Sequence, residues 1–181
     1  MIWRAGLALA ALALLASPAA AQIVPGTRAP ESPADAVDLA QALLCTLAAA
    51  GRPTPGLNMQ LIGGEGMTQL DKVPEALARF VTAAPTQKII LLQAPGEPVW
   101  IVHDAASSRC AIYSFTAAEP VVAKLLAALD RPGAWKRQKE PAVGVDHSYQ
   151  WKMAPGVRLA TEILVPDSAG EPLAVVVRPA N

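Results

Sequence analysis

Residues 88–115 read KIILLQAPGEPVWIVHDAASSRCAIYSF, and this stretch contains three apolar runs separated by turn-forming residues. The runs at 88–93, 99–102 and 110–115 are short and rich in large apolar residues, which is typical of β-strands. Pro, Gly, Asp and Ser between the runs predict hairpin connections. In the first two runs, odd-numbered and even-numbered positions are both apolar, so both faces of each strand are apolar. This predicts strands inside a sheet that is covered on each face.

Downstream of these strands the apolar pattern changes twice. A capping box at 116–119 precedes a stripe of apolar residues at helical spacing, which predicts a helix over 117–129. Three further runs, at 148–153, 157–165 and 173–177, alternate apolar and polar residues. Such alternation predicts an antiparallel meander with one solvent-exposed face. A short additional edge strand is expected near 135–139.

Two helices are predicted upstream of the strands. The first spans 32–51, because Ser32 suits the N-cap, Pro33 the first helical position and Gly51 the end of the helix. The second spans about 71–83, where apolar residues recur at helical spacing, although Pro74 disturbs its start. Between them, the segment 52–66 is rich in Pro and Gly and is predicted to be a loop.

The order of these elements predicts the fold class. Strands grouped as hairpins, without regular βαβ alternation, favour an α+β fold. We expect a mostly antiparallel sheet of five to six strands, packed by two N-terminal helices and one central helix. Because no repeat or internal linker is evident, residues 32–181 are expected to form a single domain.

The N-terminus has the pattern of a secretory signal peptide. Residues 1–21 contain Arg4 near the start, an apolar run at 5–16 and small residues at the end. The run is shorter than the roughly 20 residues that a membrane span requires, so no transmembrane span is expected after signal cleavage. Residues 22–31 lack periodicity and are expected to be a flexible leader. The protein is therefore predicted to be periplasmic or secreted.

Charge and composition exclude two classes of protein. The chain of 181 residues has 15 Lys and Arg against 15 Asp and Glu, which argues against a nucleic-acid binder. A hydrophobic content of 52% argues against intrinsic disorder. One basic cluster occupies 136–139. It fits an edge strand protected against pairing, with a contact to anionic lipid or a partner protein as the alternative.

Two cysteines, Cys45 and Cys110, are present in the chain. Cysteines in an exported domain most often pair, and two cysteines allow one intramolecular pairing. No C-x-x-C motif supports a redox role. We therefore predict a Cys45–Cys110 disulfide that links the first helix to a core strand.

Residues with catalytic potential are few. His103 and His147 each have an Asp neighbour, but adjacent side chains of a strand point to opposite faces. A hydrolytic site assembled from His103 with Ser107 or Ser108 stays open, although no G-x-S-x-G motif supports it. The sequence contains no metal-binding or phosphate-loop signature, so no metal and no cofactor are expected.

The aromatic residues are candidates for lining a ligand site. Most are expected to serve the core, and a shallow apolar cleft is expected between the sheet and the first two helices. The candidates are Trp100, Tyr113, Trp135, Tyr149 and Trp151.

The combined pattern resembles a group of small exported proteobacterial proteins whose function is uncharacterised. The resemblance lies in a helix with one cysteine (42–45), a strand opened by a second cysteine (110–115), the amphipathic helix that follows, and three alternating strands. It implies export, paired cysteines and an α+β domain. It implies no activity, so no functional residue can be carried over.

These observations favour a non-enzymatic extracytoplasmic domain that binds a protein or an envelope component. Two alternatives stay open. One is a small hydrolase with its site near His103, and the other is a carrier of a small amphiphile held between helices and sheet.

Overall fold

The computed structural model describes residues 30–51, 67–82, 84–116 and 118–180. The predicted signal peptide (1–21), the predicted loop (52–66) and all but the last two residues of the predicted leader (22–31) lie outside these ranges.

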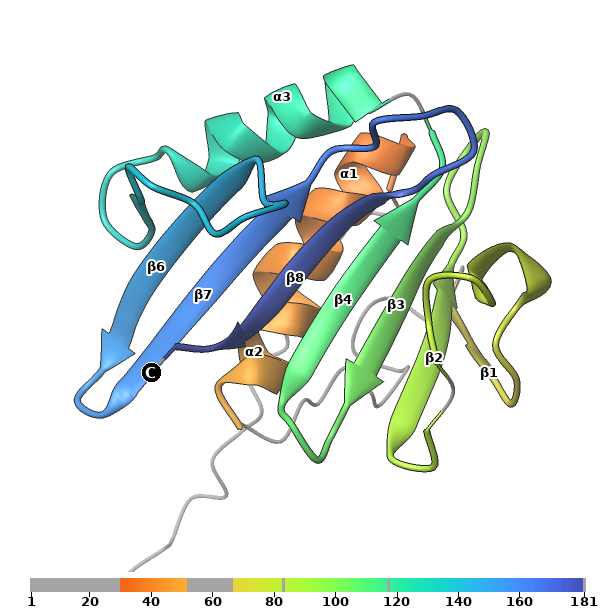
Figure 1. Ribbon diagram of the computed structural model, residues 1–181, viewed down its shortest axis with the longest axis horizontal. Coiled ribbons are helices and arrows are strands. Elements are labelled where there is room, and N and C mark those ends of the chain that lie inside the picture. Colours follow the sequence, from red (N-terminus) through yellow and green to blue (C-terminus); the bar gives the residue numbers. More distant parts are fainter. Residues whose placement is uncertain (1–29, 52–66, 83, 117, 181) are drawn as a thin grey trace, which may run out of the picture.

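The described chain forms an eight-stranded sheet in which every neighbouring pair of strands is antiparallel (Figure 1). The spatial order is β1-β2-β3-β4-β8-β7-β6-β5, so the last strand joins two groups of sequential strands. The strands are β1 (Met67–Leu70), β2 (Gln87–Leu92), β3 (Val99–Asp104), β4 (Arg109–Ser114), β5 (Lys136–Arg137), β6 (His147–Ala154), β7 (Val157–Leu164) and β8 (Leu173–Pro179).

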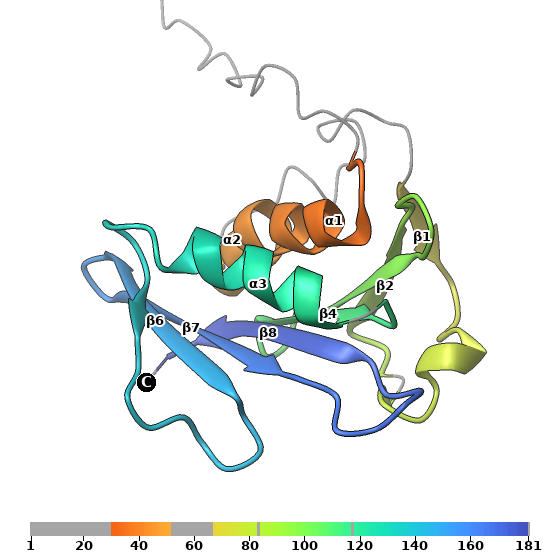
Figure 2. The same ribbon diagram turned by 90° about the horizontal axis from the view of Figure 1, so that it is seen from above.

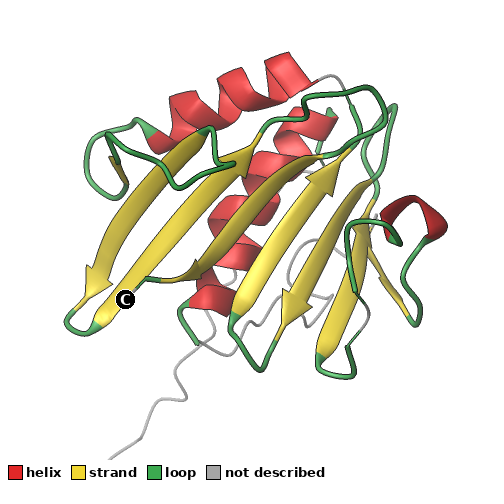
Figure 3. Ribbon diagram, in the orientation of Figure 1, coloured by secondary structure: helices red, strands yellow, loops and turns green. Residues whose placement is uncertain are grey.

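Two helices pack on the same face of this sheet (Figures 2 and 3). The first is continuous and consists of α1 (Pro33–Leu39), the π-helical segment η1 (Ala40–Cys45) and α2 (Thr46–Ala49). The second is α3 (Ala118–Leu129), which carries the chain from β4 to the edge strand β5. The helical layer therefore spans both groups of strands.

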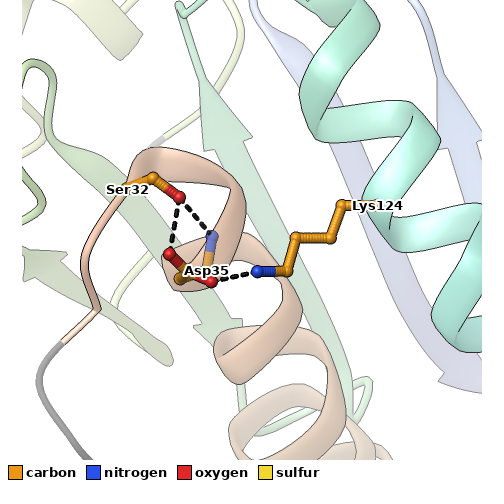
Figure 4. Close-up of polar contacts among 3 residues, drawn as sticks. All are labelled: Ser32, Asp35 and Lys124. Atoms are coloured by element: carbon orange, nitrogen blue, oxygen red, sulfur yellow. Dashed lines mark hydrogen bonds and ion pairs between the residues drawn. The ribbon is translucent and has the colours of Figure 1, made fainter.

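The start of the first helix is formed as the sequence predicts. The backbone N–H of Asp35 donates to Ser32 Oγ (3.2 Å), and the Ser32 hydroxyl donates to Asp35 Oδ2 (2.6 Å), with Pro33 at the first helical position. Asp35 also pairs with Lys124 of α3 (Figure 4). Gly51 follows the last helical turn with a positive φ of 64°, a conformation that glycine adopts without strain. The cap and the ion pair together fix the first helix against α3.

The predicted disulfide is present between Cys45 and Cys110, and both cysteines are buried. It links the end of η1 to the start of β4. A π-helical segment contains an i→i+5 hydrogen-bonding pattern, which widens the turn and rotates the following residues around the axis. Cys45 therefore lies fully inside the interface, whereas a regular helix predicts it at the rim of the apolar face.

The predicted architecture was wrong in the number of strands and of helices. The described chain has eight strands instead of five to six, and one N-terminal helix instead of two. The segment predicted as a second helix contains a single 3₁₀ turn, η3 (Glu75–Leu77). Pro74 lacks a backbone N–H and disfavours helical geometry at the residue before it, which accounts for the failure. The missed strand β1 is four residues long, and its polar Thr68 and Gln69 conceal the pattern.

The helix-covered face carries the larger hydrophobic core. Seven of the strands contribute apolar side chains to it, and these pack against buried residues of both helices. From the sheet they include Ile90, Leu92, Val99, Ile101, Ile112, Tyr149, Leu159, Ile163, Leu173, Val175 and Val177, and from the helices Val37, Leu44, Val121, Leu125 and Leu129.

A smaller apolar cluster lies on the opposite face. Leu77 and Val81 of the segment that follows β1 pack there against Ile89, Val102 and residues of β4 and β8. The apolar spacing that suggested a helix therefore serves to cover this face. Because helices cover one face and this segment the other, the prediction that β2 and β3 lie in a sheet covered on each side is confirmed.

Candidate binding surface

The sheet face opposite the helices, here called the open face, is only partly covered (Figure 2). The segment 70–82 covers it over β2, β3 and β4. Over β6 and β7 most open-face residues are exposed or half-buried and polar, as Ser148, Gln150 and Arg158 show, whereas Ala160 is buried. This confirms the predicted solvent-exposed face of the C-terminal strands, and any ligand of the sheet itself has to approach from here.

A shallow hollow of about 440 Å³, here called the groove, lies on the open face. Its walls come from five separate parts of the chain. They are Phe80; Arg109 and Tyr113 of β4; Gly144; the segment Leu164, Val165, Pro166 and Asp167; and the segment Glu171, Pro172, Ala174 and Val176.

The floor of the groove is built by strand register. Tyr113 of β4 lies opposite Ala174 of β8, and Ala174 lies opposite Leu164 of β7, so the three side chains form one row across the sheet. Val176 lies two residues further along β8 and points to the same face. The small Ala174 between two larger neighbours leaves the hollow.

The rim of the groove carries charges of both signs. Arg109 lies on one side, and Asp167 and Glu171 lie in the connection between β7 and β8. Burial raises the pKa of the Tyr113 phenol, and nearby Arg109 opposes that shift. Tyr113 is therefore a neutral hydrogen-bond donor at physiological pH. An apolar floor with a polar rim is the composition of a binding site for a protein segment or another amphipathic ligand.

Val143 stands beside this groove. Among the described residues, Val143 is the large apolar residue whose side chain is fully exposed. Its neighbour Gly144 lines the groove, with a positive φ of 78°. An exposed apolar side chain next to an apolar hollow extends the surface that a partner can bury.

The predicted aromatic candidates divide between core and surface. Tyr113 lines the groove and Trp151 lines a second hollow described below. Tyr149 is fully buried, Trp100 packs edge-on against Phe115, and Trp135 contacts Trp151. The groove also lies on the face opposite the helices, whereas the sequence predicted a cleft between helices and sheet.

His103 lies on the helix-covered face, opposite Lys88 and Cys110 in the neighbouring strands. Its Nδ1 is buried and has no hydrogen-bond partner among the described residues. Burial lowers the pKa of His103, and Lys88 lowers it further, so the imidazole is neutral at pH 7.

The serines near His103 have other partners. Ser107 donates a hydrogen bond to Asp104 Oδ2 (2.7 Å), and Asp104 Oδ1 accepts from Thr86 (2.8 Å). These bonds, with that from Ser107 as the strongest, lower the pKa of Asp104. Ser108 has a positive φ of 51° in the β3–β4 turn. Ser107 and Asp104 thus stabilise a turn, and the structure does not bring them to His103 as a triad.

No three His, Cys, Asp or Glu side chains in the described part of the chain are grouped as metal ligands. None of its helices has the length and apolar content needed to cross a membrane.

Comparisons of this chain with protein-family models, curated proteins and solved structures found no match. The function is therefore inferred from the surface itself. Tyr113 was among the aromatic candidates predicted from the sequence, whereas Leu164 and Ala174 were missed. The three residues become neighbours only through the placement of β8 between β4 and β7.

Proposed function

We propose that the protein is an exported, non-catalytic domain that binds a protein or an envelope component through the groove on its open face. The groove is the observation that carries this proposal. It combines an apolar floor, charged groups of both signs at the rim and the exposed Val143 beside it.

Export is supported by two independent features. The sequence of residues 1–21 has the composition of a secretory signal peptide. The buried Cys45–Cys110 disulfide is of the kind that persists in oxidising compartments such as the periplasm. The resemblance to small exported proteobacterial proteins points the same way.

The division of labour between the faces supports a binding role. On the helix-covered face, buried side chains of helices and strands fill the interface. The alternative hypothesis of a carrier that holds a small amphiphile between helices and sheet therefore gains no support. His103 with Ser107 gains none either, because Ser107 is bonded to Asp104. The open face is where the chain leaves apolar and charged groups accessible.

Site-specific photo-crosslinking tests the proposal. A photoreactive amino acid replaces Val143, and the protein is crosslinked in its own envelope fraction. We expect a discrete crosslinked product whose yield falls at least about fivefold when Ala174→Arg fills the groove floor, because a groove occupied by its own side chain excludes the ligand.

The matched control is Ala127→Arg, the same substitution at an exposed position of α3. This variant is expected to keep the wild-type yield. Equal yields in Ala174→Arg and wild type, with both proteins folded, would rule out the groove as the binding site.

A further inference from the structure

A second hollow, here called the basic pocket, lies at the other end of the open face. It has a volume of about 380 Å³ and is built on β5, β6 and the start of β7. Arg158 in this pocket and Leu164 in the groove are six residues apart on β7, which corresponds to roughly 20 Å. The pocket is lined by Gly133, Ala134, Lys136, Gln138, Gln150, Trp151, Lys152 and Arg158.

The charge of this pocket has one sign. Its lining contains three cations, Lys136, Lys152 and Arg158, and no Asp or Glu. None of the three forms an ion pair within the described part of the chain. By contrast, Arg178 on the same face pairs with Glu162 (2.5 Å). The protein thus neutralises one open-face cation and leaves three others converging on a hollow.

The placement of two of these cations opposes folding. Lys152 of β6 lies directly opposite Arg158 of β7, and like charges in that position destabilise a sheet. Protection of the sheet edge accounts for Lys136, because β5 is the edge strand. It also accounts for Lys152, because β5 pairs only with Tyr149 and Gln150 and, within the described chain, leaves β6 without an outer neighbour at Lys152. It does not account for Arg158, which lies on β7 between β6 and β8. A bound anion removes the repulsion between Lys152 and Arg158.

The backbone around the third cation, Lys136, is fixed by hydrogen bonds of its neighbours. Arg137, next to Lys136, donates to Asp130 Oδ2 (2.7 Å) and to the Tyr149 hydroxyl (2.9 Å), and that hydroxyl donates to Asp130 Oδ1 (2.9 Å). This network ties the two-residue strand β5 to the end of α3. The Gln138 side chain also donates to the Lys136 carbonyl (3.0 Å). The backbone that presents Lys136 to the pocket is therefore ordered before a ligand arrives.

We propose that the basic pocket binds a phosphate-bearing group. Three cations exceed what a single carboxylate neutralises, whereas a phosphate offers up to two charges and several acceptor oxygens. Arg158 and the lysines suit those oxygens, and the side-chain amide of Gln150 can donate to a neighbouring oxygen of an esterified headgroup. The inference goes beyond the proposed function, because it concerns a different hollow and a different chemistry.

Two probes separate the possible sources of the phosphate. One is glycerol 3-phosphate in solution. The other is vesicles of phosphatidylglycerol, compared with vesicles of phosphatidylcholine at the same ionic strength. Binding to the first is followed by calorimetry, and binding to the second by co-sedimentation.

We expect saturable binding of at least one probe that weakens as salt is added. Binding of the soluble ester alone identifies a free ligand, and binding of anionic vesicles alone identifies a membrane headgroup. Either result supports the pocket. Absence of saturable binding with both probes would overturn it.

The variant Lys152→Gln with Arg158→Gln tests the residues. It is expected to weaken binding by about tenfold or more, because charge-assisted hydrogen bonds are lost, and to unfold at the same or a higher denaturant concentration, because the cross-strand repulsion is relieved. The control is Lys88→Gln with Lys139→Gln, which removes the same charge at exposed positions outside the pocket. An equal loss of binding in both variants would show a general charge effect and refute the pocket. Crosslinking from position 143 is expected to be unchanged in either variant, so this test and that of the groove fail separately.

Discussion

The same strands bury their side chains on one face of the sheet and leave many of them accessible on the other. On the helix-covered face, side chains such as Leu159 and Ile163 are fully buried, and a disulfide fastens the covering helix. On the open face, the same strands present the half-buried Leu164, the ion-paired Glu162 and the unpaired Arg158. One face is therefore closed by packing, and the other leaves apolar and charged side chains accessible, which is the basis of the binding role proposed above. The predictions below compare the faces, from the largest expected effect to the smallest.

Removal of the disulfide should have the largest effect on stability. The cysteines are 65 residues apart in the chain, and closure of a loop of that length restricts the unfolded chain by about 4 kcal/mol in the chain-entropy model. The double variant Cys45→Ala with Cys110→Ala should lose roughly that amount in urea unfolding. If the variant unfolds at the wild-type midpoint, the link is not a main source of stability of the covered face.

Two leucines of β7 provide a matched comparison of the faces. Leu159 is fully buried on the covered face, whereas Leu164 is half-buried in the groove. Leu159→Ala should cost about 2–5 kcal/mol through lost burial and a cavity. Leu164→Ala should cost about 1 kcal/mol or less, because much of its surface is already in contact with water, while it reduces crosslinking from position 143. Equal losses of stability would contradict the assignment of roles to the faces.

Two tyrosines give the same comparison for hydrogen bonds. The Tyr149 hydroxyl is bonded to Asp130 and Arg137, whereas that of Tyr113 has no hydrogen bond within the described residues. Tyr149→Phe should lower the free energy of unfolding by about 1 kcal/mol, the typical contribution of such a bond. Tyr113→Phe should change it by less than about 0.5 kcal/mol. A larger loss in Tyr113→Phe than in Tyr149→Phe would reverse the comparison.

The smallest effect concerns the helical layer and depends on pH. Hydrogen bonds from Lys124, and secondarily Ser32, lower the pKa of Asp35 below its usual 3.8. Because the folded-state pKa is below the unfolded one, the stabilisation is complete at pH values above the unfolded pKa and is lost as the pH falls through the folded pKa. At pH 7 the free energy of unfolding of the wild type should be about 0.5 kcal/mol higher than that of Asp35→Asn, as expected for a partly exposed ion pair.

This difference should shrink towards zero on acidification, and Lys124→Met should show the same convergence with wild type. Chemical unfolding at several pH values measures both. A difference that grows as the pH falls would contradict the ion pair shown in Figure 4.

Local signals in the sequence predicted local structure. Ser32, Pro33 and Gly51 gave the bounds of the first helix, and the alternation after residue 147 gave the strands of the C-terminal meander. The disulfide followed from the predicted export and from the number of cysteines. The periodicity of 71–83 misled, since apolar spacing shows that residues are buried but not in which backbone conformation or on which face. The groove could not be predicted, because no local pattern places β8 between β4 and β7.

Covalent footprinting with a carbene reagent tests the central claim most directly. The protein is labelled in its own envelope fraction and, separately, after purification, and the labelled positions are compared by mass spectrometry. We predict that the envelope protects the open face at Val143, Leu164 and Lys152, and that labelling of Ala123 and Ala127 on the outer side of α3 is unchanged. Protection of α3 with an unprotected open face would contradict the claim that this face of the sheet is the one that binds.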